Sequence, residues 1–272
     1  MLPVASVTAA QARGLQALFT DIDGTLTDPD GRIAADVFRV LEAAREDGMA
    51  VVPITGRPAG WADMIARTWP VDGVVGENGG LYFRRDVDAS GQEIMLRVWA
   101  QDEATRRANR VRMNALGDAV LAAHPGAALA SDQAYRVFDV AIDFCEDVPP
   151  LPEADIDAIV AQLAAAGCHV KVSNIHVNAW LGDFDKASMC RRYCADRWGW
   201  DLDGPDRERA VFFGDSPNDA PLFALFPFGV GVANVRRMEQ RMDALPRFVT
   251  RGEGGAGFVE AVEHLLDLRG WA

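Results

Sequence analysis

Short apolar runs that alternate with amphipathic segments constrain the fold of this chain most strongly. The apolar runs lie at 15–21, 50–55, 210–215 and 229–233. The segments that follow them carry apolar residues at helical spacing and lie at 36–47, 58–69, 218–226 and 255–268. A strand that is apolar on both faces must be covered on both, as happens in parallel sheets flanked by helices. The pattern therefore predicts an α/β fold with a doubly wound parallel sheet.

The middle of the chain has a different pattern. Here strand-like segments alternate apolar and polar side chains, which indicates a sheet with one open face, and they lie at 93–99, 134–144, 168–173 and 176–180. Helical patterns at 102–123 and 153–166 separate some of these strands, and the proline-rich stretch 146–155 is expected to be a rigid connector. We therefore expect a second α/β module at 84–180, inserted into a first module made of 1–83 and 181–272.

Charge and apolar content exclude several classes of function. The 272 residues carry a formal net charge of −13, which disfavours nucleic acid as a partner unless a local basic patch exists. The chain lacks a run of about 18 apolar residues, so we expect no membrane span. The N-terminal stretch lacks the features of a signal peptide, and the four cysteines form no C-x-x-C pair. We therefore expect a cytoplasmic protein in a reducing compartment.

Oxygen-bearing side chains follow three of the predicted parallel strands directly. Asp21 and Asp23 follow the first, Thr55 follows the second, and Asp215 follows the third, with Asp219 four residues later. Open α/β sheets bind ligands beyond the carboxyl ends of their strands, so we expect these groups to meet. Neighbouring carboxylates resist ionising together and need a cation. Oxygen ligands alone suit a hard ion, and we expect Mg²⁺.

Four motifs occur along the chain in order: DIDGTLT at 21–27, TGR at 55–57, Lys186 within DKAS, and GDSPND at 214–219. Through them the chain resembles the haloacid dehalogenase superfamily of phosphotransferases. The resemblance covers the parallel module and implies a Rossmann-like core, with the inserted α/β module as a cap domain. The position and character of the insert are similar to those of phosphosugar phosphatases, including sucrose- and trehalose-phosphate phosphatases, and of phosphomannomutases.

The resemblance implies a role for each matching residue. Asp21 would be the nucleophile and form an aspartyl-phosphate, and Asp23 would be the general acid for the leaving group and then the base for water. Thr55 and Lys186 would hold the phosphoryl oxygens. Mg²⁺ would be ligated by Asp21, the backbone carbonyl of Asp23, and Asp215. Asn218 and Asp219 would lie behind these ligands and support them. Physical reasoning agrees, because a carboxylate and a phosphate dianion repel each other until a metal and a lysine cancel that charge.

Further residues are candidates for binding the substrate. Gly56 and Arg57 complete the TGR motif, and Arg57 either contacts phosphate or sugar or neutralises the acidic edge. Asn78, within GENGG at 76–80, lies either near the substrate or in a plain turn.

Strand alternation predicts more substrate contacts in the inserted module. It places His176, Asn178 and Trp180 on the polar face of one strand and Lys171 on the polar face of its neighbour. If the insert closes over Asp21, this face becomes the roof of the site. His176, Asn178 and Lys171 would then bind hydroxyls or charge, and Trp180 would stack on a sugar ring. Otherwise the face is merely solvated.

These observations together predict a Mg²⁺-dependent phosphatase for a small phosphorylated metabolite, with a sugar phosphate as the first candidate. A phosphosugar mutase is the nearest alternative, since it uses the same aspartates but returns the phosphoryl group to a sugar hydroxyl. A catalytically silent binding protein on the same fold is the second alternative. The presence of both Asp21 and Asp23 argues against it.

Overall fold

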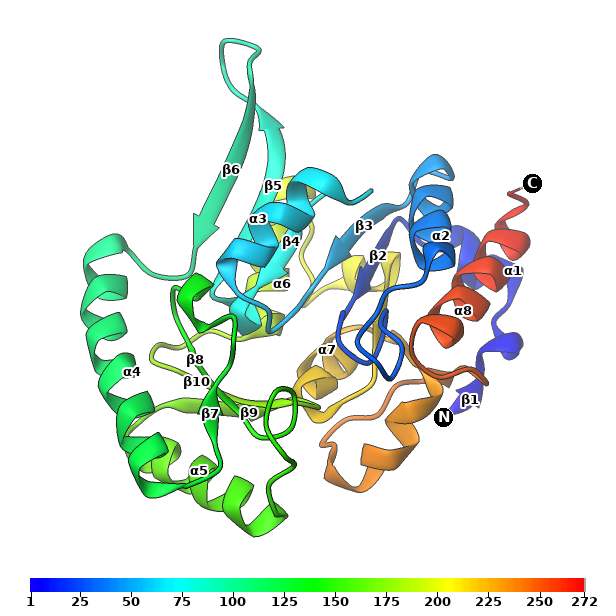
Figure 1. Ribbon diagram of the computed structural model, residues 1–272. Coiled ribbons are helices and arrows are strands. Elements are labelled where there is room, and N and C mark those ends of the chain that lie inside the picture. The colour runs from blue at the N-terminus through cyan, green and yellow to red at the C-terminus, as the bar shows by residue number, and fades with distance from the viewer. Residues whose placement is uncertain (272) are drawn as a thin grey trace.

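The computed structural model describes residues 1–271 and contains the expected parallel sheet at its centre (Figure 1). Six strands pair in parallel in the order β1-β13-β12-β11-β2-β3. Their bounds are β1 (Leu2–Pro3), β2 (Ala17–Thr20), β3 (Ala50–Pro53), β11 (Ala210–Gly214), β12 (Phe228–Gly231) and β13 (Phe248–Val249).

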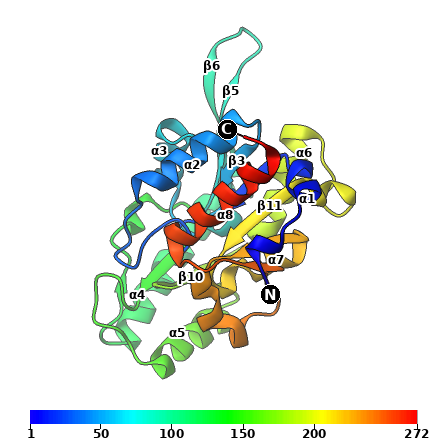
Figure 2. The ribbon, with the colours of Figure 1, turned by 90° about the vertical axis from the view of Figure 1, so that its right-hand side faces the viewer.

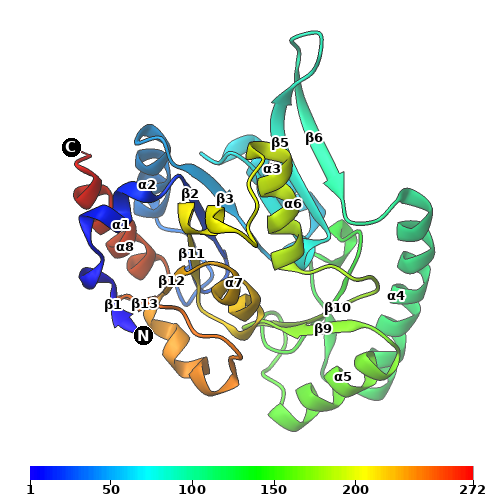
Figure 3. The same ribbon diagram turned by 180° about the vertical axis from the view of Figure 1, so that it is seen from behind.

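Helices cover both faces of this sheet, as a doubly wound fold requires. One face carries α1 (Ala9–Gly14), α2 (Ala35–Glu46), α3 (Ala59–Thr68) and α8 (Gly254–Arg269), and the other carries α6 (Lys186–Trp198) and α7 (Ala220–Leu225). Figure 2 shows α2 and α8, and Figure 3 shows α6 and α7. Alternate residues of β2 point to opposite faces: Leu18 packs with α2 and α8, and Phe19 packs with α6 and α7. The predicted fold class is confirmed.

Three antiparallel strands extend the core, which corrects one expectation. They are β4 (Val74–Gly76), β5 (Leu81–Val87) and β6 (Glu93–Trp99), and a bridge from Ile54 to Val75 joins them to the parallel sheet. The expected boundary at residue 84 falls inside β5, and the strand expected at 93–99 belongs to this hairpin rather than to the insert. Residues at the base of β5 are buried against the core, and the Tyr82 hydroxyl donates to Asp196 of α6 at 2.8 Å.

The inserted module is a second sheet backed by two helices. Its strands pair in the order β7-β8-β10-β9, with bounds β7 (Ala128–Leu129), β8 (Val140–Asp143), β9 (His169–Val172) and β10 (His176–Trp180). Apolar side chains of these strands pack on α4 (Glu103–Ala123) and α5 (Glu153–Ala165), which lie on the side away from the core (Figure 1). The strand expected at 134–144 is shorter, because residues 133–135 form a 3₁₀ turn.

Short 3₁₀ turns complete the structure: η1 (Val4–Ser6), η2 (Glu77–Gly79), η3 (Gln133–Tyr135), η4 (Pro205–Arg209), η5 (Pro217–Asp219) and η6 (Ala233–Arg241). The four cysteine thiols are free. Among the helices within residues 1–271, none combines the length and the apolar character needed to cross a membrane.

A buried carboxylate of the core holds the inserted module in place. Glu77, in η2, accepts hydrogen bonds from the backbone N–H groups of Ala59 at 2.9 Å, Val137 at 2.8 Å, Phe138 at 2.6 Å and Asp139 at 3.3 Å. Burial, and then the nearby Asp139 carboxylate, raise the pKa of Glu77 to about 7. Since residues 137–139 lead into β8, this one side chain sets how the module meets the core.

Glu77→Gln tests this junction. Glutamine keeps one acceptor oxygen but turns an NH₂ group toward backbone N–H donors, so we expect a free energy of unfolding lower by about 1–3 kcal/mol. Urea denaturation at pH 8, where Glu77 is ionised, measures it. Glu42→Gln, exposed on α2, is the matched control and should change the same quantity by less than about 0.5 kcal/mol. A loss no larger than the control's contradicts the assigned role.

Candidate active site

The predicted acidic residues meet at the carboxyl ends of the parallel strands. Asp21 follows β2, Asp215 follows β11, and Asp219 lies in η5. One carboxylate oxygen of each lies within 4.8 Å of the others, and all three side chains are buried. Residues far apart in the sequence therefore converge because the strands that carry them are neighbours in the sheet.

Lys186 connects two of these carboxylates. It is the first residue of α6, whose start is capped by Asp185, which accepts from the backbone N–H of Ser188 at 2.7 Å. The Lys186 Nζ lies 2.8 Å from Asp21 Oδ1 and 2.8 Å from Asp219 Oδ1. Burial opposes the charge, but the two carboxylates raise the pKa of Lys186 above its ordinary value. The ammonium therefore stays charged inside the protein.

Three carboxylates against one ammonium leave this buried cluster with excess negative charge. Burial, and the other acids after it, raise the pKa of Asp21 well above its ordinary value and the pKa of Asp215 to about 7. Asp215 also accepts from Thr25 Oγ1 at 3.3 Å and from the amides of Asn174 at 2.9 Å and Asn234 at 2.7 Å. The donor set is all oxygen and its charge is unbalanced, so a hard divalent cation such as Mg²⁺ fits it.

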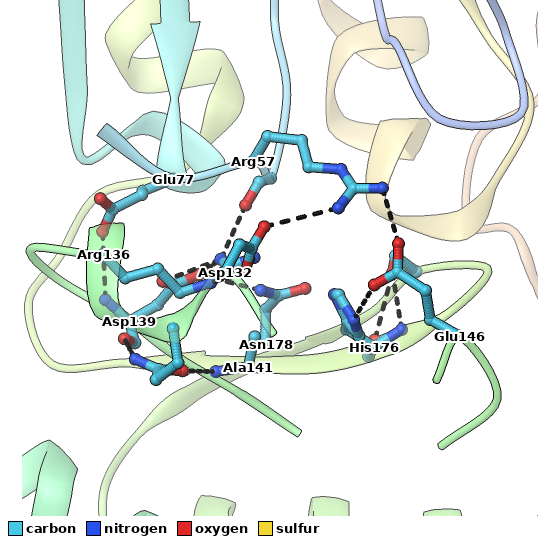
Figure 4. A network of polar contacts seen from close by, with 12 residues as sticks. Arg57, Glu77, Asp132, Arg136, Asp139, Ala141, Glu146, His176 and Asn178 are labelled. Atoms are coloured by element: carbon cyan, nitrogen blue, oxygen red, sulfur yellow. Dashed lines mark hydrogen bonds and ion pairs between the residues drawn. The ribbon is translucent and has the colours of Figure 1, made fainter. Parts of the chain in front are cut away.

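Asp23 faces a different partner. Arg57 Nε and Nη2 bind its two carboxylate oxygens at 2.8–3.1 Å. The same guanidinium reaches into the inserted module, where Nη1 lies 3.4 Å from Asp132 and Nη2 lies 3.0 Å from Glu146 (Figure 4). Arg57 thus contacts three carboxylates at the acidic edge, and its contact with a substrate stays a prediction.

The remaining residues of the core candidates form the wall beside Arg57. The buried hydroxyl of Thr55 accepts from the backbone N–H of Arg57 at 3.0 Å. A side chain at Gly56 would lie 3.2 Å from the Asn78 amide, and the Gly56 carbonyl accepts from Arg136 at 2.9 Å. Asn78 has a left-handed backbone, with φ of 52°, and its N–H donates to the Thr55 carbonyl at 3.1 Å. Asn78 therefore shapes the TGR loop.

Two of the four roof candidates face the site. His176 Nε2 lies 2.8 Å from Glu146, and the Asn178 amide donates to Asp139 at 2.9 Å (Figure 4). Lys171 pairs in register with Asn178 and shares its face, but it is not among the residues that line the cleft.

Trp180 is not available for a sugar ring. Its side chain is buried, its indole N–H donates to the Phe184 carbonyl at 3.0 Å, and it stacks on Phe184. Alternation placed it on the polar face, but its position at the end of β10 puts it in the core where the chain returns from the insert. The expected contact is therefore wrong in this structure.

The side chains of both modules enclose what we call the inner cleft. It has a volume of about 20 Å³, room for about one water molecule, and its lining includes Asp21, Asp23, Arg57, Asn174, His176 and Asn178. A larger outer hollow of about 600 Å³ lies next to it, and its lining includes Asp23, Arg57, Glu146, Asn174, Asp215 and Asn234. Asp23, Arg57 and Asn174 line both.

Several site residues were not predicted: Asp132, Arg136, Glu146, Asn174 and Asn234. Asn234 follows β12 as Asp215 follows β11, so the strand-end argument could have included it. Asn174 lies in the turn between β9 and β10, and Glu146 lies in the stretch interpreted only as a connector. No spacing in the sequence places either of them beside Asp23.

The chain is similar in sequence to known proteins. A family model described as haloacid dehalogenase-like hydrolase matches residues 18–105. Phosphoglycolate phosphatase of Archaeoglobus fulgidus is 30% identical over 256 residues, which cover 93% of this chain and 98% of that protein. The phosphoglycolate phosphatase of Methanoculleus marisnigri is 29% identical over 252 residues, 92% of this chain and 96% of its own.

Solved structures share the fold at lower identity. A Thermoplasma acidophilum protein has a TM-score of 0.67 at 20% identity, over 93% of this chain and 99% of its own. The sucrose-phosphatase of Synechocystis has a TM-score of 0.61 at 16% identity, over 93% of this chain and 98% of its own. The motifs, the fold and the full-length relative at 30% identity agree. The chain belongs to the haloacid dehalogenase-like hydrolases and is a phosphoric monoester hydrolase.

Proposed function

We propose that this phosphatase transfers the phosphoryl group of a small metabolite to Asp21 and then to water. The observation that carries the proposal is the buried Asp21 carboxylate, held by Lys186 at 2.8 Å where the inner cleft reaches the acidic cluster. A covalent intermediate divides one difficult displacement into two easier ones. Lys186 would also stabilise charge on the phosphoryl oxygens, with the Thr55 hydroxyl as a further donor.

Asp21, Asp215 and the backbone carbonyl of Asp23 would hold Mg²⁺. When bound, the ion would supply positive charge that offsets the repulsion between carboxylate and phosphate. Asn174, Asn234 and Thr25 orient Asp215 through their hydrogen bonds. Asn218 and Asp219 would support the ion from behind, and Asp219 is fixed there by Lys186 and by the backbone N–H of Asp215 at 3.1 Å.

Asp23 would move the proton. In the first step it would give a proton to the leaving oxygen, and in the second it would take one from the attacking water. In this structure Arg57 contacts both carboxylate oxygens of Asp23. For the first step, Arg57 must bind something else and leave Asp23 free to carry the proton.

A short phosphorylated hydroxy acid is the substrate class that we propose first. The sequence relatives are named phosphoglycolate phosphatases, and the inner cleft is small. Arg57 and His176, which line the inner cleft together with Asp23, suit an anionic leaving group. A sugar phosphate is the second candidate, favoured by the fold shared with a sucrose-phosphatase, although Trp180 is not placed to stack on a sugar.

The nucleophile is tested by replacing each aspartate with asparagine. Asp21→Asn should lose all turnover because an amide cannot form the acyl phosphate, whereas Asp23→Asn should lower kcat by about 10²–10⁴-fold. Asp36→Asn, 71% exposed on α2, should keep wild-type activity. Release of inorganic phosphate measures all three. Turnover by Asp21→Asn above the level explained by deamidation would exclude the mechanism.

The metal is tested by chelation. EDTA should abolish phosphate release and Mg²⁺ should restore it, whereas Ca²⁺ should inhibit because its looser coordination misplaces the nucleophile. Mg²⁺ should also raise the Tm, since a ligand of the native state stabilises it. Full activity in EDTA without added divalent ion contradicts the metal role of Asp215.

The substrate class is tested with a panel of phosphomonoesters at saturating Mg²⁺. We expect kcat/KM for 2-phosphoglycolate to exceed that for glucose 6-phosphate and for p-nitrophenyl phosphate by at least about tenfold, since hydrogen bonds to a charged group contribute about 1.5–3 kcal/mol. A preference for glucose 6-phosphate would instead support the sugar-phosphate alternative.

A further inference from the structure

Each cationic side chain that lines the inner cleft, within residues 1–271, already has a carboxylate partner. Arg57 contacts Asp23, Asp132 and Glu146. Arg136 contacts Asp132 at 2.9 Å and Asp139 at 3.0 Å. The imidazole of His176 contacts Glu146. An anionic leaving group therefore finds no free positive charge there unless one of these carboxylates withdraws.

Glu146 is the carboxylate best placed to withdraw. Asp132 and Asp139 are buried, and Asp23, 25% exposed, would move the proton. The Glu146 side chain is 26% exposed and lies on the loop after β8. Its oxygens divide between two nitrogen-bearing side chains, with Oε1 at 3.0 Å from Arg57 Nη2 and Oε2 at 2.8 Å from His176 Nε2 (Figure 4). These contacts lower the pKa of Glu146 to about 2, so it is ionised at neutral pH.

The loop that carries Glu146 is itself held firmly. The buried Asp143 carboxylate accepts from the backbone N–H groups of Cys145 at 2.9 Å, Glu146 at 2.7 Å and Asp147 at 2.8 Å. The side chain can therefore rotate while its backbone stays in place. Glu146 lines the outer hollow, which gives the displaced carboxylate a solvated position close by.

We infer that Glu146 is a specificity-determining residue, which occupies the place of a second anionic group on the substrate until such a group displaces it. This inference rests on the proposed phosphatase function. A substrate carboxylate, or a second phosphate, would replace the Glu146 carboxylate beside Arg57 and His176, so both side chains would keep an anionic partner. A neutral leaving group cannot replace the Glu146 carboxylate, so it must bind while Glu146 still contacts Arg57 and His176.

Glu146→Gln tests the inference, because glutamine has nearly the same shape but no charge. We compare 2-phosphoglycolate with ethyl phosphate, which lacks only the carboxylate. The KM for 2-phosphoglycolate should fall about threefold or more, the KM for ethyl phosphate should stay within about twofold, and kcat should change little for either. Asp147→Asn is the matched control, since it removes the same charge from the next, exposed residue, and it should leave the ratio of the two KM values unchanged.

The opposite result would overturn the inference. If Glu146 only positions Arg57, then Glu146→Gln raises KM or lowers kcat for both esters. Equal changes for both esters, or a ratio no different from that of Asp147→Asn, also exclude it. Calorimetric binding of each ester to Asp21→Asn, with and without Glu146→Gln, gives the same comparison without turnover. If wild type hydrolyses neither ester, the proposed substrate class is wrong, and the binding ratio alone then decides the role of Glu146.

Discussion

The contact of the Lys186 ammonium with Asp21 and Asp219 is the interaction on which the rest of the site depends. A buried charge without a partner is costly, so these three side chains must assemble together. Asp21 follows β2, Lys186 begins α6 and Asp219 lies beside α7. The contact therefore joins the parts of the core that come before and after the insert in the sequence. It also places the start of α6, where the chain re-enters the core, at the carboxyl ends of the parallel strands. Asp215 adds a third carboxylate to this cluster, and the cation that we propose would balance the remaining negative charge.

The inserted module takes part in the site directly. Asn174, in its β9–β10 turn, donates to Asp215, and Arg57 of the core contacts Asp132 and Glu146 of the module. The carboxylate of Glu77 fixes the backbone at residues 137–139. Phe138 of the insert packs on Trp99 and Phe184, but around the very small cleft core and insert meet through charged and polar groups. Such an interface can exchange its internal ion pairs for those of a substrate, as an apolar interface cannot.

The parallel core and its acids were predictable from local patterns, and the contacts between modules were not. Asp21, Thr55 and Asp215 follow strands that neighbour each other in the sheet, so chain order and sheet geometry suffice to bring them together. The β5–β6 hairpin has the same alternation as the strands of the insert, and only its packing on the core distinguishes them. Trp180 follows the alternation of β10, but the return of the chain to Phe184 buries it. The positions of Glu146 and Asn174 depend on how the two modules dock, and the spacing of apolar and polar residues in the sequence does not predict that docking.

The central claim is that Asp21 carries the phosphoryl group between the two steps. Rapid acid quenching of Asp23→Asn with ³²P-labelled p-nitrophenyl phosphate and Mg²⁺ tests it directly, because nitrophenolate leaves without a proton from Asp23, whereas hydrolysis of the intermediate still lacks its base. We predict label on the peptide that contains Asp21, removed by hydroxylamine as an acyl phosphate requires. Label on a different peptide, or release of labelled phosphate with no labelled protein at any quench time, would contradict the account.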